Sequence, residues 1–249
     1  MVIIAFFLVA YIITWILHGL IVFFRIPFKG AGSSRAQILY MFGLAGPLVA
    51  SFLLAYASYG HVGVSNLLSG VLKWNVGLIW YFLAIAPVGI IYFLSAVAYR
   101  LWKKEQFPLF KRPERGLFLL IFGQVWVVIA EEIGWRGFAL PHLEVVFGWL
   151  GAGLVLGILW ASWHLPMFFV SGSNQYGSSF FKYMCVLTIW SLFMAMLYYQ
   201  TNGSVLLCMI FHAAANVWAF ITNVPKSAER FELLLYMPIL TVALTMLPL

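Results

Sequence analysis

Apolar stretches long enough to cross a lipid bilayer, which takes about 20 residues, recur along almost the whole chain. Of the 249 residues, 64% are hydrophobic and 8% are charged, and a soluble domain of this length has no interior large enough to bury so much apolar surface. The stretches are continuous rather than alternating, which favours helices over a transmembrane β-barrel. We therefore predict an all-α, polytopic membrane protein.

We expect about eight transmembrane helices in a single domain that covers residues 1–249. The first helix is expected to be a retained span, because it is too long and too weakly flanked by charge for a cleaved signal peptide. The segment His61–Lys73 is either an interfacial helix or a loop. The approximate spans are Val2–Phe24, Gln37–Ser58, Gly77–Ala98, Leu117–Ile133, Trp149–Val170, Tyr183–Tyr199, Ser204–Thr222 and Leu233–Leu247.

The basic residues are distributed unevenly between the loops. One set of loops carries 12 of the 14 Lys and Arg side chains, whereas the opposite set carries only Lys73 apart from Arg136. The positive-inside rule places the basic set in the cytoplasm and both chain termini outside. The net charge of +7 is therefore explained by membrane topology rather than by nucleic-acid binding, and we expect a multi-pass protein of a bacterial or archaeal plasma membrane. The twelve are Arg25, Lys29, Arg35, Arg100, Lys103, Lys104, Lys111, Arg112, Arg115, Lys182, Lys226 and Arg230.

Two adjacent glutamates, Glu131 and Glu132, lie at the end of the fourth apolar stretch, and Arg136 follows one helical turn after the second. The chain has 7 acidic residues in all, so two of them at membrane depth are a notable concentration. An ionised carboxylate is costly in hydrocarbon, and ionisable groups within spans therefore mark functional sites. We expect Glu132 to pair with Arg136, while Glu131 points to a different side of the helix and faces the site.

Two further spans carry polar side chains at membrane depth. His164 lies in the sequence WASWH, and His212 and Asn216 lie in HAAAN, four residues apart and so on one helical face. In lipid such groups must face each other or a water-filled cavity. We therefore expect one polar cavity inside the bundle, with the Glu132–Arg136 pair behind its wall. Its predicted lining is Glu131, His164, His212 and Asn216.

This set of side chains suits the hydrolysis of an amide bond by an activated water molecule. Burial and a neighbouring cation act in opposite directions on a carboxyl group, and their balance permits Glu131 to act as a general base. His164 can share the proton of the attacking water. The N–H groups of His212 and Asn216 can stabilise the oxyanion of a tetrahedral intermediate. The sequence places no serine or cysteine beside a histidine and an acid as a nucleophile.

Other interpretations of the same residues stay open at this point. Glu131, His164 and His212 would form a zinc site with an open position for water, although no HExxH sequence is present. The polar groups would also serve a non-catalytic immunity or adaptor protein that binds a peptide in the cavity, or simply tie helices together. A proton-coupled transporter is disfavoured, because the chain has no sign of an inverted repeat.

Three short motifs resemble those of the CAAX-protease and bacteriocin-processing family of membrane proteins, also called the Abi family. EEIGWR is similar to its EExxxR motif, HAAAN to HxxxN, and WASWH to FxxxH, with Trp160 where phenylalanine is usual. The order and spacing of the motifs agree, and the matched core covers about residues 117–220. We expect this segment to be the catalytic core and the aromatic exchange at Trp160 to be conservative.

The resemblance implies an intramembrane endopeptidase related to the CAAX prenyl endopeptidases, which remove the last three residues from prenylated proteins. It implies that Glu131 and His164 activate the water and that His212 and Asn216 form the oxyanion hole. It favours a glutamate-dependent reaction without a metal cofactor. The implied partners are the lipid bilayer and a lipidated or otherwise membrane-associated peptide, of prenylated, bacteriocin or signal type.

Overall fold

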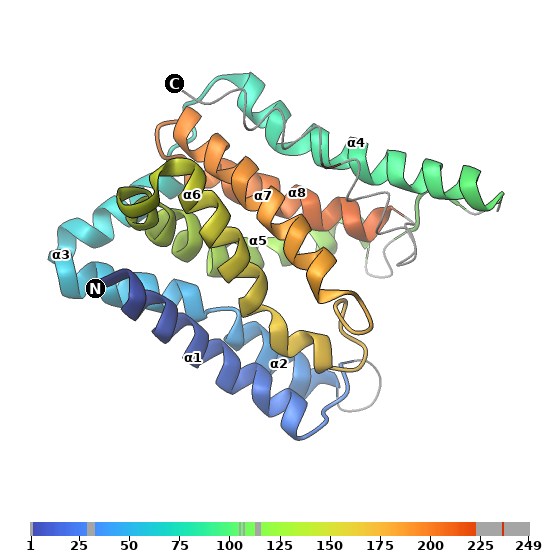
Figure 1. The fold of residues 1–249 in the computed structure, drawn as a ribbon, viewed down its shortest axis with the longest axis horizontal. Coiled ribbons are helices and arrows are strands. Elements are labelled where there is room, and N and C mark those ends of the chain that lie inside the picture. The colour runs from blue at the N-terminus through green and yellow to red at the C-terminus, as the bar shows by residue number, and fades with distance from the viewer. Residues whose placement is uncertain are drawn as a thin grey trace.

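The computed structural model describes residues 2–28, 33–104, 106, 108–112, 116–222 and 236. These residues form an all-α bundle of apolar helices, which confirms the predicted fold class (Figure 1). The elements in chain order are α1 (Val2–Phe23), α2 (Ser33–Gly43), α3 (Gly46–Val71), α4 (Leu78–Lys103), α5 (Gly116–Gly134), the π-helix η1 (Trp135–Ala139), α6 (Leu140–Trp163), the 3-10 helix η2 (Leu165–Phe169), α7 (Phe180–Gln200) and α8 (Val205–Ile221).

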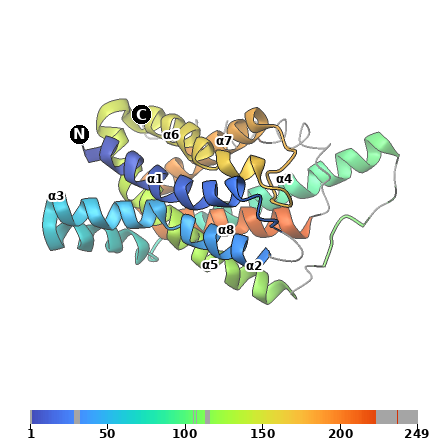
Figure 2. The same cartoon turned by 90° about the horizontal axis from the view of Figure 1, so that it is seen from below.

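Most of the helices run back and forth along the long axis of the molecule, so their connections gather at two opposite ends (Figure 2). Helix α1 packs against α3, α6 against α7, and α4 against α8. Helix α5 contacts both α3 and α8 and so lies in the middle of the bundle. The end of α5 that carries the two adjacent glutamates is buried, whereas its first half exposes large side chains such as Phe118 and Phe122.

Within the described residues, five helical stretches are long and apolar enough to cross a membrane, and α8 is apolar but shorter, with 17 residues. The expected number of eight spans is not confirmed. The stretch Gly116–Phe169 joins two segments that we expected to be separate spans, and the last expected span, Leu233–Leu247, lies outside the described residues. The five stretches are Val2–Phe23, Ser34–Val71, Leu78–Lys103, Gly116–Phe169 and Phe180–Gln200.

Two glycines bend helices that would otherwise be continuous. Gly60 in α3 has φ 60° and ψ −147°, and Gly148 in α6 has φ 65° and ψ 169°. Both lie in the positive-φ region, which a residue with a Cβ atom adopts only with strain. The first bend resolves an open alternative, because the residues from His61 to Val71 continue α3 as helix. The second bend, at Gly148, lies directly before Trp149, where we expected a new span to begin.

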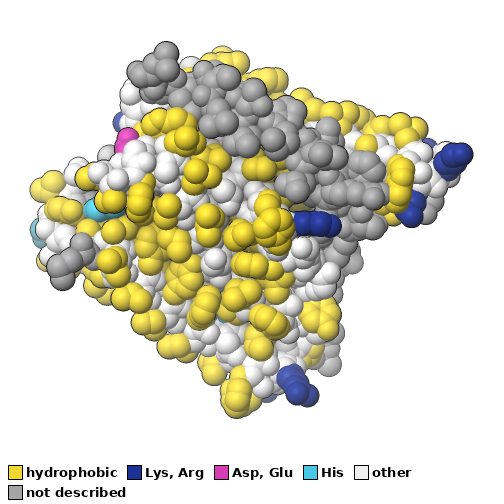
Figure 3. Space-filling view, in the orientation of Figure 1, with side chains coloured by type: hydrophobic (Ala, Val, Ile, Leu, Met, Phe, Trp, Pro, Cys, Tyr) yellow, Lys and Arg dark blue, Asp and Glu magenta, His cyan; other side chains and the backbone are white. Residues whose placement is uncertain are grey.

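The face of the bundle drawn in Figure 3 carries many apolar side chains, as contact with lipid requires. Large hydrophobic side chains such as Phe23, Leu78 and Phe118 are almost fully exposed. Basic side chains lie near the helix ends instead: Arg25 lies two residues after the end of α1, and Lys103 lies in the last turn of α4. The membrane orientation implied by these charges stays a prediction.

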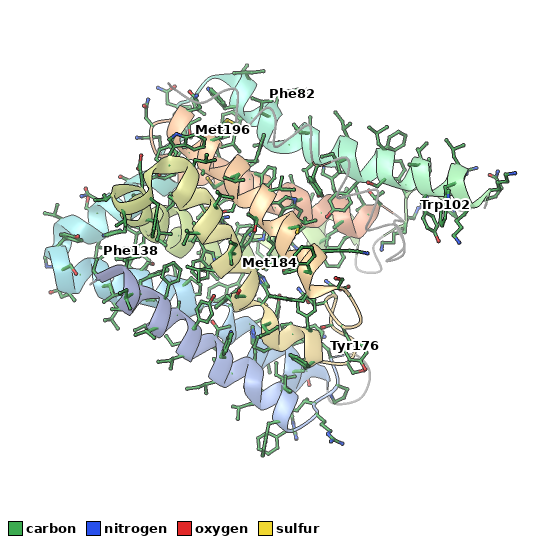
Figure 4. The ribbon with its side chains drawn as sticks, viewed as in Figure 1. Phe82, Trp102, Phe138, Tyr176, Met184 and Met196 are labelled. Atoms are coloured by element: carbon green, nitrogen blue, oxygen red, sulfur yellow. The ribbon has the colours of Figure 1, made fainter. Side chains whose placement is uncertain are left out.

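Helix α4 extends past the rest of the bundle at its C-terminal end (Figures 1 and 4). Trp102 lies on this extension, and the ammonium group of Lys103 lies 4.4 Å from its ring centroid. Aromatic and basic side chains together are typical of the lipid headgroup region. A helix of 26 residues is also longer than the hydrocarbon core needs, so we expect this end to reach the membrane surface.

A cluster of buried aromatic rings fixes α1 to the segment that follows α5. Phe138 of η1 stacks on Phe6 of α1 with ring centroids 5.2 Å apart (Figure 4). Trp135 contacts the edges of both Phe6 and Trp163, at 5.5 and 5.6 Å. The indole N–H of Trp163 donates to Thr14 Oγ1 at 2.8 Å, which ties α6 to α1. Aromatic rings of α1 and α6 therefore hold η1 in place.

Helices α3 and α5 approach each other closely at Gly134, two residues after the second glutamate. A Cβ atom at this position would lie 2.5 Å from the carbonyl oxygen of Pro47. Small residues permit such close helix packing in membranes, where van der Waals contact replaces the hydrophobic effect.

We expect Gly134→Ala to lower the stability of the protein by about 1–3 kcal/mol, because the added methyl group must push two helices apart. Gly123→Ala is the matched control, since it lies in the same helix and a Cβ atom there meets nothing within 4 Å. Thermal unfolding in detergent measures both variants. Equal melting temperatures for the two alanine variants would show that α3 and α5 are not tightly packed at Gly134.

Candidate active site

The two adjacent glutamates lie inside a helix and not at its end. Glu131 is 2% exposed and Glu132 is fully buried. The helix continues past them because α5 passes directly into the π-helix η1 and then into α6. The two glutamates therefore do not form a solvated helix end.

The π-helix gives Arg136 its position. In η1 the backbone N–H of Leu140 donates to the carbonyl of Trp135, five residues back, instead of the usual four. The extra residue in the turn shifts the register of the helix after the glutamates. Single π turns of this kind are frequent at functional sites.

Glu132 is bonded to two basic side chains. Arg136 Nη1 donates to both carboxylate oxygens, at 2.8 and 3.0 Å, and both side chains are fully buried. His212 Nδ1 lies 2.7 Å from Oε1 of the same carboxylate. The pairing predicted between Glu132 and Arg136 is thus present, and it extends to α8 through His212.

Glu131 has a different partner, the indole of Trp160. The indole N–H donates to Glu131 Oε2 at 2.7 Å, across 29 residues of sequence. We expected tryptophan in place of phenylalanine at this position to be conservative. That expectation is wrong, because a phenyl ring has no N–H group to donate.

His164 lies at the C-terminal end of α6, directly beside this hydrogen bond. Its Nδ1 lies 2.9 Å from the backbone carbonyl of Trp160. A carbonyl only accepts, so Nδ1 carries the proton and Nε2 keeps its lone pair. The ring is 8% exposed and has edge-on contacts with Trp163 at 4.7 Å and Tyr183 at 5.5 Å. These contacts leave Nε2 as the basic atom of the imidazole.

His212 and Asn216 lie one turn apart on α8, and both face α5. The amide nitrogen of Asn216 donates to Oε1 of Gln124 at 2.8 Å. Gln124 is buried, and the sequence reasoning missed it. A signal was present, since Gln124 precedes Glu131 by seven residues and so lies on the same face of the helix, two turns earlier.

The single cavity predicted for these residues is not confirmed. A groove of about 320 Å³ borders η1 at Gly137 and Phe138, and its other lining comes from α3, α6 and α7. None of the six predicted site residues lines this groove. The six are Glu131, Glu132, Arg136, His164, His212 and Asn216.

A metal-ligand set exists in the site, although it differs from the predicted one. Donor atoms of Glu131, Glu132 and His212 all lie within 4.8 Å of one another. The prediction had His164 in place of Glu132. Since Glu132 is bonded to Arg136 and to His212 Nδ1, a metal at this position would have to replace those hydrogen bonds.

Comparison with known proteins points to one family. Residues 113–218 match the family model described as type II CAAX prenyl endopeptidase, Rce1-like. The chain is also 32% identical over 110 residues to a protein of Methanococcus maripaludis named CAAX prenyl protease 2. That alignment covers 41% of this chain and only 38% of the relative's length. All six predicted site residues lie within the segment that matches the family.

We expect Glu132→Ala to lower stability by about 3–5 kcal/mol, because it leaves the guanidinium of Arg136 buried without a carboxylate. The double variant Glu132→Ala/Arg136→Met should be more stable than the single variant, since it removes both charges. Thermal unfolding in detergent measures both. A double variant that is no more stable than Glu132→Ala would contradict the role of Glu132 as the counter-ion.

Proposed function

The chain belongs to the CAAX-protease and bacteriocin-processing family, and from that premise we propose that it is an intramembrane endopeptidase. The proposed reaction is hydrolysis of a peptide bond in a membrane-associated peptide. One observation carries the assignment of residues: Glu131 and His164 are both held by Trp160, the first by its indole and the second by its carbonyl. Each of them keeps one basic atom available for a water molecule.

In the proposed reaction Glu131 is the general base. Its Oε2 accepts the indole N–H, so Oε1 is the oxygen that takes a proton from water. The water oxygen attacks the carbonyl carbon of the substrate, and His164 Nε2 accepts a hydrogen bond from the same water. When the C–N bond of the tetrahedral intermediate breaks, the proton on Glu131 passes to the leaving nitrogen.

His212 and Asn216 are proposed to stabilise the oxyanion. The Asn216 amide has two N–H groups. One donates to Gln124, and the other is available for the oxyanion. His212 donates from Nδ1 to Glu132, so a second N–H at Nε2 requires the imidazolium form. The net charge of the cluster of Glu131, Glu132 and Arg136 favours the imidazolium form of His212. Two carboxylates and one guanidinium sum to −1, and an imidazolium brings the cluster to zero.

We propose that the substrate is a lipidated or otherwise membrane-associated peptide, such as a prenylated C-terminus or a bacteriocin or signal peptide. The name of the Methanococcus maripaludis relative supports the prenylated class. The apolar surface of the helices allows such a lipid group to reach the site through the bilayer. The multi-pass architecture supports residence in a membrane, and we propose that this is a bacterial or archaeal plasma membrane.

We expect Glu131→Gln and His164→Ala each to reduce cleavage by at least about 100-fold, since general acid–base groups typically contribute that much. Cleavage is measured in liposomes on a quenched-fluorescent peptide with a farnesyl group, and the products are identified by mass spectrometry. Glu144→Gln is the control, because Glu144 lies outside the three motifs, and unfolding temperatures show that the variants fold.

Cleavage by Glu131→Gln at the wild-type rate would contradict the assignment of the base. A wild-type protein that binds the peptide without cutting it would favour the non-catalytic, peptide-binding alternative.

We also propose that the reaction needs no metal ion, because Glu132 and His212 are already bonded to each other. Treatment with 1,10-phenanthroline or EDTA should then leave the initial rate unchanged. Loss of activity that only Zn²⁺ restores would assign water activation to a metal held by Glu131, Glu132 and His212 instead.

A further inference from the structure

Trp160 contacts several of the predicted site residues at once. Its side chain is 1% exposed and lies between charges of opposite sign. The indole N–H donates to Glu131, and the guanidinium carbon of Arg136 lies 4.3 Å from the centroid of the ring. The edge of the ring also meets His212 at 5.3 Å.

The two halves of the indole suit these two charges. The face of an aromatic ring is electron-rich and attracts a cation, whereas the N–H at its edge is positive and attracts a carboxylate. Nε and Nη2 of Arg136 are buried and have no hydrogen-bond partner among the described residues, so the ring face is their compensating contact. The indole therefore stabilises Arg136 and Glu131 at once while the guanidinium stays bonded to Glu132.

The indole also fixes the orientation of the Glu131 carboxylate. A buried carboxylate needs hydrogen bonds, and Trp160 supplies the one that the described residues give to Glu131. With Oε2 held at 2.7 Å, the carboxylate cannot rotate freely, and Oε1 keeps one direction. A base that is held in this way needs no reorganisation when the water arrives.

We infer that Trp160 is a positioning residue whose indole N–H holds Glu131 in its reactive orientation. The inference rests on the proposed function, because it assigns the residue that orients the proposed base. It also gives this chain a donor that the phenylalanine usual in the family motif lacks.

Trp160→Phe tests the N–H alone, because the phenyl ring keeps an aromatic face for Arg136 and leaves the backbone carbonyl for His164. We expect kcat to fall by about tenfold or more, which corresponds to about 1.4 kcal/mol, with KM unchanged. Trp126→Phe is the control. Trp126 also lies on α5 but outside the site, and its indole N–H donates to the Met41 carbonyl at 3.1 Å. Its replacement should therefore leave kcat unchanged. An active wild type whose Trp160→Phe variant keeps the full kcat would overturn the inference.

A second measurement does not depend on cleavage. The indole N–H groups of the 11 tryptophans are observed by NMR in detergent with ¹⁵N-labelled protein, and the Trp160 signal is the one lost in Trp160→Phe. In Glu131→Gln this signal should move upfield, because a neutral amide oxygen is a weaker acceptor than a carboxylate. The Trp126 signal should stay in place. A Trp160 signal that does not move would overturn the inference, even if the protein cleaves no peptide.

Discussion

The site depends on one buried ionic network, in which Glu132 binds Arg136 and His212. In an apolar bundle a lone carboxylate or guanidinium would carry a large desolvation cost, and only mutual pairing makes either tolerable. The network also joins three elements, since its members come from α5, η1 and α8. Helix packing in lipid gains little from the hydrophobic effect, so these bonds fix how α8 lies against α5.

The backbone next to this network forms a π-helix, η1, which the contacts of the network help to stabilise. The π-helix η1 begins three residues after Glu132 and contains Arg136. A π turn is less favourable than an α-helical turn, and it persists where the surrounding contacts stabilise it. Here the ring contacts of Trp135 and Phe138 with α1 hold one side of η1, while the bonds of Arg136 to Glu132 hold the other. Packing and charge together stabilise the unusual turn.

The sequence predicted those features that follow from local spacing. Apolar length gave the helical class, and the four-residue spacing of Glu132 and Arg136 gave their pair. Features that depend on how separate helices face each other were missed. To predict the hydrogen bond between Asn216 and Gln124, one must know that α8 lies against α5. Local sequence spacing does not contain that information. The expected number of spans is not confirmed for a related reason, because apolarity does not tell where a helix bends and where it ends.

The two glutamates show why the missing information matters for chemistry. The four-residue spacing to Arg136 already separates them in the sequence, and tertiary contacts increase the difference. Glu132 is bonded to two basic side chains, Arg136 and His212. Glu131 accepts its hydrogen bond from Trp160, a neutral donor, and so retains the ability to accept a proton. In the proposed reaction, the pair divided in this way provides both a fixed counter-ion and a base. The Trp160 indole contacts both sides of the division, since its ring face meets the guanidinium of Arg136 and its N–H meets the Glu131 carboxylate.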